Sequence, residues 1–367
     1  MRNILQIMDY AAPYKGNFIP SIENLETHLR QSGNRLIYMF PEGARKIDWV
    51  FQLQKEGKIV YFLDHSFFSK RIKLRNILDL LKVIKKEGVS IIHTHFIAYN
   101  YTLVLMKMIF LHDIKIIGNF MNEFHPPFNK YRRFKIFITD STFDSIIASS
   151  SAVKESIINT GLSSGKVKIV YNALDTEHLQ VYDKIDFSDN DSQKIVLMFG
   201  WTFLRKGVDI AIYAINELID EGRDIRLVIA MAGGMEIVEN EIKNQLGNVP
   251  SWITLMGPTS NVASYYNSTD IFLSASREEG FTYSVLEASY CNPMIILSEI
   301  GGHPLDIPYV GKFESESFTQ LKKSIIDMLK KNNEERKVMN EAQKNYVSRT
   351  YDVNNWSKDI IKIYSNI

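Results

Sequence analysis

The sequence predicts an α/β protein with two doubly wound parallel domains, and three observations support this. Short apolar runs that suit buried strands alternate with helix-like runs in both halves of the chain. The 367 residues are too many for one typical core and suit two. Residues 176–193 are rich in Asp and Ser without apolar periodicity, so they predict a linker between domains at 1–175 and 194–350.

Each domain is expected to begin with a strand and to continue by alternation. In the first half the expected strands lie near residues 4–8, 35–39, 59–63, 91–94, 114–117 and 145–148. In the second half they lie near residues 194–200, 225–230, 253–255, 271–273 and 294–297. The clearest helical periodicity spans residues 74–86. The amphipathic, aromatic residues 351–367 predict a C-terminal helix that packs back toward the first domain.

The composition is that of a folded protein of a reducing compartment. Hydrophobic residues make up 45% of the chain and charged residues 23%. The single cysteine, Cys291, excludes an internal disulfide and a cysteine-rich metal site, and its apolar neighbours predict a core position. The first ten residues indicate a strand instead of a signal peptide. The longest apolar stretch, 101–111, falls short of the roughly 20 residues of a spanning helix.

The net charge of +1 conceals a difference between the two halves. Residues 1–180 carry 24 basic and 16 acidic side chains, whereas residues 181–367 carry 19 and 26. Basic and aromatic residues cluster at 67–75 and 130–135, which indicates attraction to an anionic membrane surface. Two solvated helix faces would also explain the clusters. No recognition motif accompanies them, so nucleic acid is not an expected partner.

Two acidic residues flank a predicted helix start in the second half. Glu279 and Glu287 follow a short apolar strand at 270–274, so the helix would begin at the carboxyl end of a parallel strand. Free backbone N–H groups at such a helix start bind anions, and phosphate is the obvious anion. The alternative is a capping box, in which Ser284 and Glu287 only close the helix end.

Three further motifs occur in the same part of the chain. Gly200 ends the first strand of the second half, where it permits a close backbone approach, and Arg205 and Lys206 follow with fixed positive charge. An Asn-x-x-Asp turn stands at 172–175, and a glycine pair stands at 301–302.

In this order and spacing the four motifs resemble glycosyltransferase family 4, whose members are retaining enzymes of the GT-B fold. The resemblance covers residues 165–305 well and the first half only by general pattern. It implies two Rossmann-like domains that face a central cleft. The first would bind the acceptor and the second a nucleotide-sugar donor.

The resemblance also implies roles for single residues. Arg205, Lys206 and Glu279 would be catalytic, with the two cations on the donor diphosphate and Glu279 on the donor sugar and phosphate. Further donor-binding positions would be Gly200, Gly280, Phe281 and Thr282, with Glu287 on the ribose hydroxyls and Met256, Gly257 and Pro258 on the base. No metal or other cofactor is expected, because cationic side chains can replace an ion.

The chain departs from the family at several positions. Trp201 stands where the family commonly has an arginine, and Met121 or Asn122 occupies the place of a first-domain histidine. The acceptor-side candidates are therefore Gly16, Asn119, Asn122, Glu123 and His125. Ordinary solvated loop positions would also explain Gly16 and His125. His93 and His95 are expected to be satisfied strand-end residues.

The function implied by the resemblance is retaining transfer of a hexose-type sugar to a glycan or lipid-linked acceptor. A UDP-sugar is the expected donor, since UDP is the commonest donor nucleotide of the family, although GDP donors occur. Bacterial capsule, exopolysaccharide or cell-wall glycan assembly fits, at the inner face of the cytoplasmic membrane. One alternative is a noncatalytic GT-B partner of another transferase, and a sugar-nucleotide epimerase of GT-B fold is another.

Overall fold

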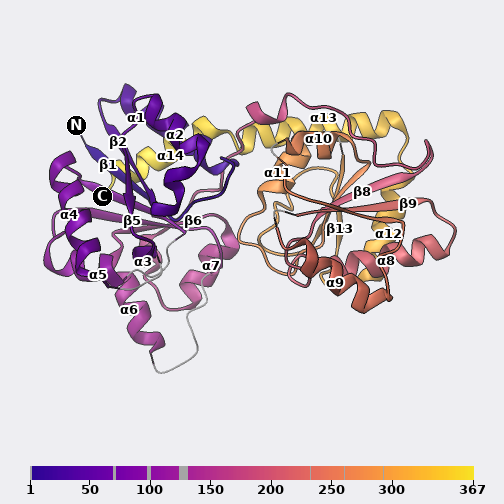
Figure 1. Ribbon diagram of the computed structural model, residues 1–367, viewed down its shortest axis with the longest axis horizontal. Helices are drawn as coiled ribbons and strands as arrows, with labels where there is room; N and C mark the ends of the chain where they lie inside the picture. Colours follow the sequence, from indigo (N-terminus) through magenta and orange to yellow (C-terminus); the bar gives the residue numbers. More distant parts are fainter. Residues whose placement is uncertain are drawn as a thin grey trace. The chain divides into compact units, whose positions relative to one another are not determined.

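The protein consists of two compact units, seen in a computed structural model (Figure 1). The structure describes residues 2–68, 72–96, 101–123, 131–231, 233–259, 261–291 and 293–367. Unit 1 comprises Met1–Ala173 and Val353–Ile367, and unit 2 comprises Leu174–Asp352.

Unit 1 is built on a seven-stranded parallel sheet in the order β3-β2-β1-β4-β5-β6-β7. Its strands are β1 Asn3–Met8, β2 Arg35–Pro41, β3 Val60–Leu63, β4 Ile91–His95, β5 Lys115–Phe120, β6 Ser145–Ala148 and β7 Val167–Ile169. The sequence prediction missed β7. That strand has three residues, two of them exposed, so it leaves no apolar run to recognise.

Helices cover both faces of this sheet, which is therefore buried on both sides (Figure 1). One face packs against α1 Phe18–Gln31, α2 Asp48–Lys55 and α14 Val353–Ser365. The other packs against α4 Leu74–Glu87, α5 Tyr101–Ile109 and α7 Ser151–Asn159, with α3 His65–Phe68 and α6 Arg132–Thr142 on the same side. The periodicity predicted at 74–86 is present in α4, which ends at Gly88 with φ 58°.

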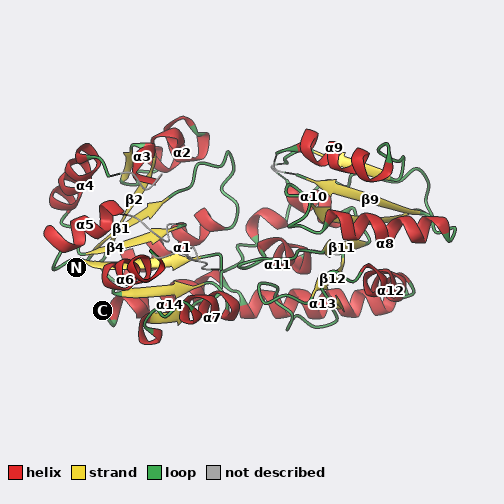
Figure 2. Ribbon diagram, turned by 90° about the horizontal axis from the view of Figure 1, so that it is seen from below, coloured by secondary structure: helices red, strands yellow, loops and turns green. Residues whose placement is uncertain are grey.

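Unit 2 is built on a six-stranded parallel sheet in the order β10-β9-β8-β11-β12-β13. Figure 2 labels β9, β11 and β12 of this sheet. Its strands are β8 Lys194–Phe199, β9 Ile225–Ala230, β10 Ile253–Met256, β11 Ile271–Ser274, β12 Met294–Ser298 and β13 Gly311–Phe313. On one face lie α8 Val208–Asp220, α9 Met235–Leu246 and α12 Phe318–Leu329. On the other lie α10 Val262–Asn267, α11 Tyr283–Tyr290 and α13 Asn333–Thr350. The predicted fold class, with two doubly wound parallel domains, is thus confirmed.

Residues 176–193, predicted as a linker, lie within unit 2. Leu179 and Phe187 are buried in its core, and the backbone N–H groups of Asp183 and Ile185 donate to Ser264 and Ser268 on and beside α10. Isolated apolar residues at irregular spacing can thus attach a segment that has no secondary-structure periodicity.

At the C-terminus, residues 353–367 belong to unit 1, where α14 packs against α1. The chain therefore returns to its first unit at the end.

Candidate functional site

The predicted donor residues gather at the carboxyl edge of the unit 2 sheet. The strand order reverses between β8 and β11, which are neighbours, and ligands of open α/β sheets bind outside such a reversal. The loop after β8 carries Arg205 and Lys206, and the loop after β11 carries Glu279. Lys206 and Glu279, which lie 73 positions apart in sequence, are thereby brought into contact.

Lys206 and Glu279 form a buried ion pair. The Lys206 ammonium donates to Glu279 Oε1, and the Ser276 hydroxyl donates to the same oxygen at 2.8 Å. The two charged side chains are only 6% and 9% exposed. Burial lowers the pKa of Lys206, and the Glu279 carboxylate opposes this by favouring the charged ammonium.

Arg205 adds a second cation with more solvent exposure. Its guanidinium Nη1 lies 3.6 Å from Glu279 Oε2, and its side chain is 39% exposed. Two cations therefore face one carboxylate, so these three side chains together carry one net positive charge. Such a site attracts an anionic group.

Arg277 connects the loop after β11 to the loop after β8, a role that the sequence prediction missed. Its guanidinium bonds both carboxylate oxygens of Asp209 in α8, at 2.8 and 2.7 Å, and also bonds Glu316 and the Leu204 carbonyl. Its backbone N–H donates to the Arg205 carbonyl at 2.9 Å. The only sequence signal was an arginine two residues before Glu279. A single side chain with five donors thus fixes the loop of both cations.

Two glycines set the spacing of these loops. A Cβ on Gly207, which has φ +66°, would lie 2.0 Å from the Ala275 carbonyl oxygen, and one on Gly302 would lie 1.8 Å from the Glu279 carbonyl oxygen. Any side chain at either position would push the loops apart. At Gly200 the close neighbours are core side chains, since a Cβ there would lie 2.5 Å from Ile229.

Glu287 lies in the first turns of α11 and does not form a capping box. The N-cap of that helix is Thr282, without a side-chain hydrogen bond, and Ser284 lies inside the helix, so the capping-box alternative is wrong. Instead the Tyr266 hydroxyl donates to Glu287 Oε2 at 2.7 Å, and His178 Nε2 lies 3.6 Å from Oε1.

The sequence prediction missed His178, whose only signal is its place three residues after the junction motif. Burial lowers the pKa of His178, but Glu287 and Asp175 outweigh it and raise the pKa above the ordinary value. The carboxylate of Glu287 is thus held from two sides.

The remaining donor-side residues lie around these loops. Gly280, Phe281 and Thr282 lead directly into α11, and Thr282 is buried. Met256 is the last residue of β10, two strands from β8, and Gly257 and Pro258 follow it.

His303 belongs to the glycine-pair motif and is a neutral, buried side chain. Its Nδ1–H donates to the Ser298 carbonyl at 2.8 Å, and its Nε2 accepts from Ser274 at 2.9 Å. Burial lowers the pKa of His303 to about 4. The residue therefore holds β11 to the loop after β12 without a charge.

In unit 1 the predicted acceptor-side residues within the described part of the chain lie on two segments, one before α1 and one at the end of β5. Gly16 has φ 56° and precedes α1, whereas Asn119 is buried at the end of β5 and Asn122 and Glu123 follow that strand. His125 lies outside the described residues.

Asn119 belongs to a buried chain of neutral polar groups. It bonds His95 at 3.2 Å, His95 bonds Gln6 at 2.7 Å, and Gln6 and His93 both bond the Tyr364 hydroxyl. Burial lowers the pKa of both histidines. Both ring nitrogens of His95 have hydrogen-bond partners, as the sequence analysis expects. His93 differs, because its Nε2 has no partner within the described residues.

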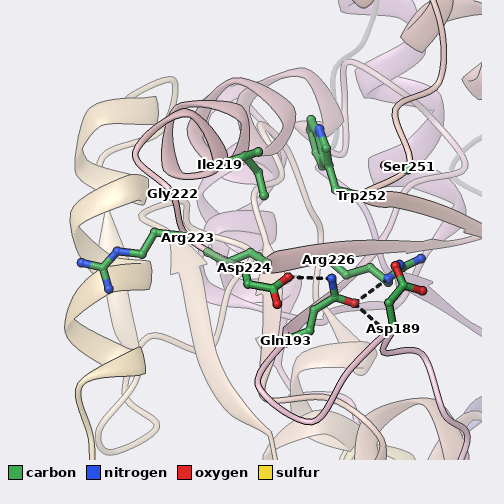
Figure 3. Close-up of a pocket in the computed structure, with 10 residues that line it drawn as sticks. Asp189, Gln193, Ile219, Gly222, Arg223, Asp224, Arg226, Ser251 and Trp252 are labelled. Carbon is green, nitrogen blue, oxygen red and sulfur yellow. Dashed lines mark hydrogen bonds and ion pairs between the residues drawn. The ribbon is translucent and has the colours of Figure 1, made fainter.

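A surface cavity of about 360 Å³ lies at the opposite edge of the unit 2 sheet (Figure 3). It lies beside the starts of β8, β9 and β10. Its polar side chains bond one another: Gln193 donates to Asp224 at 2.7 Å and accepts from Arg226 at 2.9 Å. It contains none of the predicted donor residues.

Among the described residues, no group of three His, Cys, Asp or Glu side chains is placed to hold a metal ion. In the same residues, no helix combines the length and the apolar character that crossing a bilayer requires.

Two family models match the chain, one in each half. Glycosyltransferase Family 4 matches residues 21–178, and Glycosyl transferases group 1 matches residues 193–330. Over its whole length the chain is 22% identical to the phosphatidylinositol N-acetylglucosaminyltransferase GPI3 subunit of Saccharomyces cerevisiae, of which it covers 83%.

Solved glycosyltransferase structures share the fold. A glycosyltransferase from Rickettsia africae superposes with a TM-score of 0.80 at 19% identity, covering 100% of this chain and 98% of that one. Anabaena HepE in complex with UDP superposes with a TM-score of 0.76 at 14% identity, covering 100% of both chains. The chain therefore belongs to the GT-B glycosyltransferases of family 4 and group 1.

Proposed function

We propose that the protein transfers a hexose-type sugar from a UDP-sugar to a glycan or lipid-linked acceptor with retention of configuration. The observation that carries the proposal is the Lys206–Glu279 pair beside Arg205, at the carboxyl ends of β8 and β11. A transferase needs fixed positive charge where the donor diphosphate leaves. The UDP complex of Anabaena HepE supports UDP as the donor nucleotide.

In the proposed reaction the bond between the sugar anomeric carbon and the diphosphate oxygen breaks while the acceptor oxygen bonds the same face of that carbon. The acceptor proton passes to the departing phosphate oxygen, so no separate base is needed. Arg205 and Lys206 stabilise the negative charge on the diphosphate, and we expect no metal ion there. Glu287 would accept hydrogen bonds from the ribose hydroxyls, and the segment after β10 would contact the base.

A noncatalytic role is less well supported. A protein that only binds a partner needs no buried cation at the phosphate position, whereas this chain keeps Lys206, Glu279 and Arg205 in mutual contact. The departures at Trp201 and near Met121 leave that cluster intact.

Binding and product analysis test the proposal. UDP at a hundred times its dissociation constant should stabilise the fold by about 2.7 kcal/mol, and GDP should stabilise it less. NMR of the product should show the donor's anomeric configuration. If no acceptor yields transfer, and Lys206→Ala leaves the cellular glycan unchanged, the enzyme assignment fails.

We also propose that unit 1 docks on an anionic membrane at the cytoplasmic face, which suits a lipid-linked acceptor of capsule, exopolysaccharide or cell-wall glycan assembly. Large exposed apolar side chains gather on and beside α4, α5 and α6: Ile72, Leu74, Leu78, Met108, Ile109, Phe110, Tyr131, Phe134 and Phe137. These helices contact one another in sequence order. Exposed basic residues accompany them: Lys73, Arg75, Lys82, Lys85 and Arg133.

Such a surface inserts aromatic side chains among headgroups and attracts anionic lipids. The cluster predicted at 67–75 contributes only in part, because Phe67 and Phe68 are buried core residues. Residues 69–71 and 130 lie outside the described residues.

Vesicle sedimentation tests this docking. The double variant Phe134→Ser, Phe137→Ser should bind phosphatidylglycerol-containing vesicles about tenfold more weakly or worse. Phe51→Ser is the matched control, since Phe51 is 52% exposed on α2 at the other face of the sheet. Equal binding to pure phosphatidylcholine vesicles, or equal loss in the control, would count against docking.

A further inference from the structure

The Lys206 ammonium lies between a carboxylate and an aromatic ring. On one side it bonds Glu279, and its Nζ also lies 4.3 Å from the centroid of the Trp201 ring. Trp201 itself is 40% exposed, whereas the Lys206 side chain is only 6% exposed. The indole therefore shields the ammonium and keeps its own outer part in solvent.

We infer that Trp201 is a positioning residue for the phosphate-binding cation, because its ring covers the Lys206 ammonium and holds it against Glu279. The part of this inference that concerns the donor rests on the proposed function. The contact itself is independent of any donor.

The local backbone makes this contact specific. Trp201 and Lys206 stand at the two ends of one tight loop, in which the Lys206 N–H donates to the Thr202 carbonyl at 2.9 Å. The Trp201 ring also meets Phe199, with centroids 6.0 Å apart, so the end of β8 supports it. The ring attracts the cation by its electron-rich face, and this attraction grows as water is removed.

A tryptophan at position 201 works differently from an arginine, the residue that the family resemblance led us to expect there. An arginine would bring another positive charge beside Lys206 and Arg205. The indole brings none, and it limits the water around Lys206. The loop thus retains one buried and one exposed cation, and the buried one is fixed by contact on two sides.

Lysine labelling tests the inference without a donor. Acetic anhydride modifies only the neutral amine, so the labelling rate at Lys206, followed by mass spectrometry across pH, reports both its pKa and its exposure. Burial lowers the pKa of this lysine, so the wild-type midpoint should lie below that of exposed lysines. In Trp201→Ala the limiting rate should rise, because the reagent reaches the amine. The midpoint should move to higher pH, because relief from burial, the largest cause of the lowered pKa of Lys206, outweighs the lost attraction of the ring.

Trp201→Phe is the matched variant that keeps a ring, and it should retain most of the wild-type profile. Equal profiles in the wild type and Trp201→Ala would overturn the inference, as would an equal change in both variants. Melting temperatures identify any variant that unfolds. If Trp201→Ala unfolds, Trp201→Leu, which keeps an apolar side chain without a ring, takes its place, and a wild-type profile in that variant would overturn the inference.

Isothermal titration with UDP separates this inference from the proposed function. UDP affinity should fall at alkaline pH as Lys206 loses its proton, and Trp201→Ala should shift that fall to higher pH. A wild-type protein that binds no UDP would overturn the proposed function, while the labelling profile would still decide the contact. A protein that binds UDP with the same pH dependence in both forms would overturn the positioning role.

Discussion

Each unit contains a Lys–Glu pair with a buried carboxylate, and the two pairs differ in where they lie on the sheet. In unit 1 the Lys58 ammonium is 2.6 Å from Glu26 Oε2, and the Tyr38 hydroxyl donates to the same oxygen at 2.9 Å. In unit 2 Glu279 accepts from Lys206 and a serine hydroxyl. The local chemistry is nearly the same.

The positions relative to the strands differ. Lys58 precedes β3, at the amino edge of its sheet, and its partner lies in the middle of α1. Lys206 and Glu279 follow β8 and β11, where α8 and α11 also begin. Helix starts and loop N–H groups face ligands only at the carboxyl edge. An ion pair therefore indicates a ligand-binding site only when it lies at the carboxyl edge of the sheet. The presence of the pair by itself does not indicate one.

The largest expected effect comes from removing each lysine in turn. Lys206→Met and Lys58→Met should both destabilise the fold, by about 3–5 kcal/mol at most, because a buried carboxylate loses its nearer cation and keeps only an arginine, Arg205 in unit 2 or Arg30 in unit 1. Only Lys206→Met should also lower transfer by the folded enzyme, by about 10²–10³-fold. Urea unfolding measures the loss of stability. Sugar-transfer assays at urea concentrations below the unfolding transitions of both variants measure the loss of activity. Equal losses of transfer would show that the comparison is wrong.

Much of the fold was predictable because parallel strands buried on both faces read as short apolar runs. Each predicted strand is present, but β7 and β13 were missed, since three residues at a sheet edge carry too few apolar side chains. The attachment of residues 176–193 to unit 2 was also missed. Leu179 and Phe187 are single buried residues, and periodicity cannot identify them.

In the candidate site the sequence indicated which loops meet but not which atoms pair. The motif order placed Lys206 and Glu279 in neighbouring loops, because each follows a strand. Their direct contact, and the contact of Lys206 with the Trp201 ring, depend on side-chain directions that no spacing specifies. Arg277 and His178 were missed for the same reason, since their partners lie far away in sequence.

A smaller effect is expected from Glu279→Gln, which keeps the shape of the side chain and removes its charge. The carboxylate raises the pKa of Lys206 against burial, so its loss should lower that pKa further. The alkaline fall of transfer should then move to lower pH, with a loss of about 10–100-fold at neutral pH. A pH–rate profile checks this, and an unmoved alkaline limb would contradict it. Glu26→Gln in unit 1 should leave the profile unchanged.

Glycines in the two units give the next contrast. Gly302→Ala places a Cβ 1.8 Å from the Glu279 carbonyl oxygen, and overpacking of this kind costs about 1–3 kcal/mol. It should also weaken donor binding, because the Glu279 loop must shift. Gly43→Ala in unit 1 meets nothing within 4 Å and serves as control. Denaturant unfolding measures the stability of each variant, and UDP titration measures its donor affinity. Equal stability and equal UDP affinity in the two variants would refute the spacing role of Gly302.

The smallest effect distinguishes the histidines of the two units. Burial lowers the pKa of His93 and His95, whereas Glu287 raises that of His178 above its ordinary value of about 6.5. A raised pKa contributes stability that is fully present below the unfolded-state pKa and lost as pH rises through the folded-state pKa. Glu287→Gln should therefore lower the pKa of His178 and remove that contribution at acidic pH, while His93 and His95 keep their values. Histidine ring NMR across pH measures this directly, and an unchanged His178 titration would mean that Glu287 does not hold it.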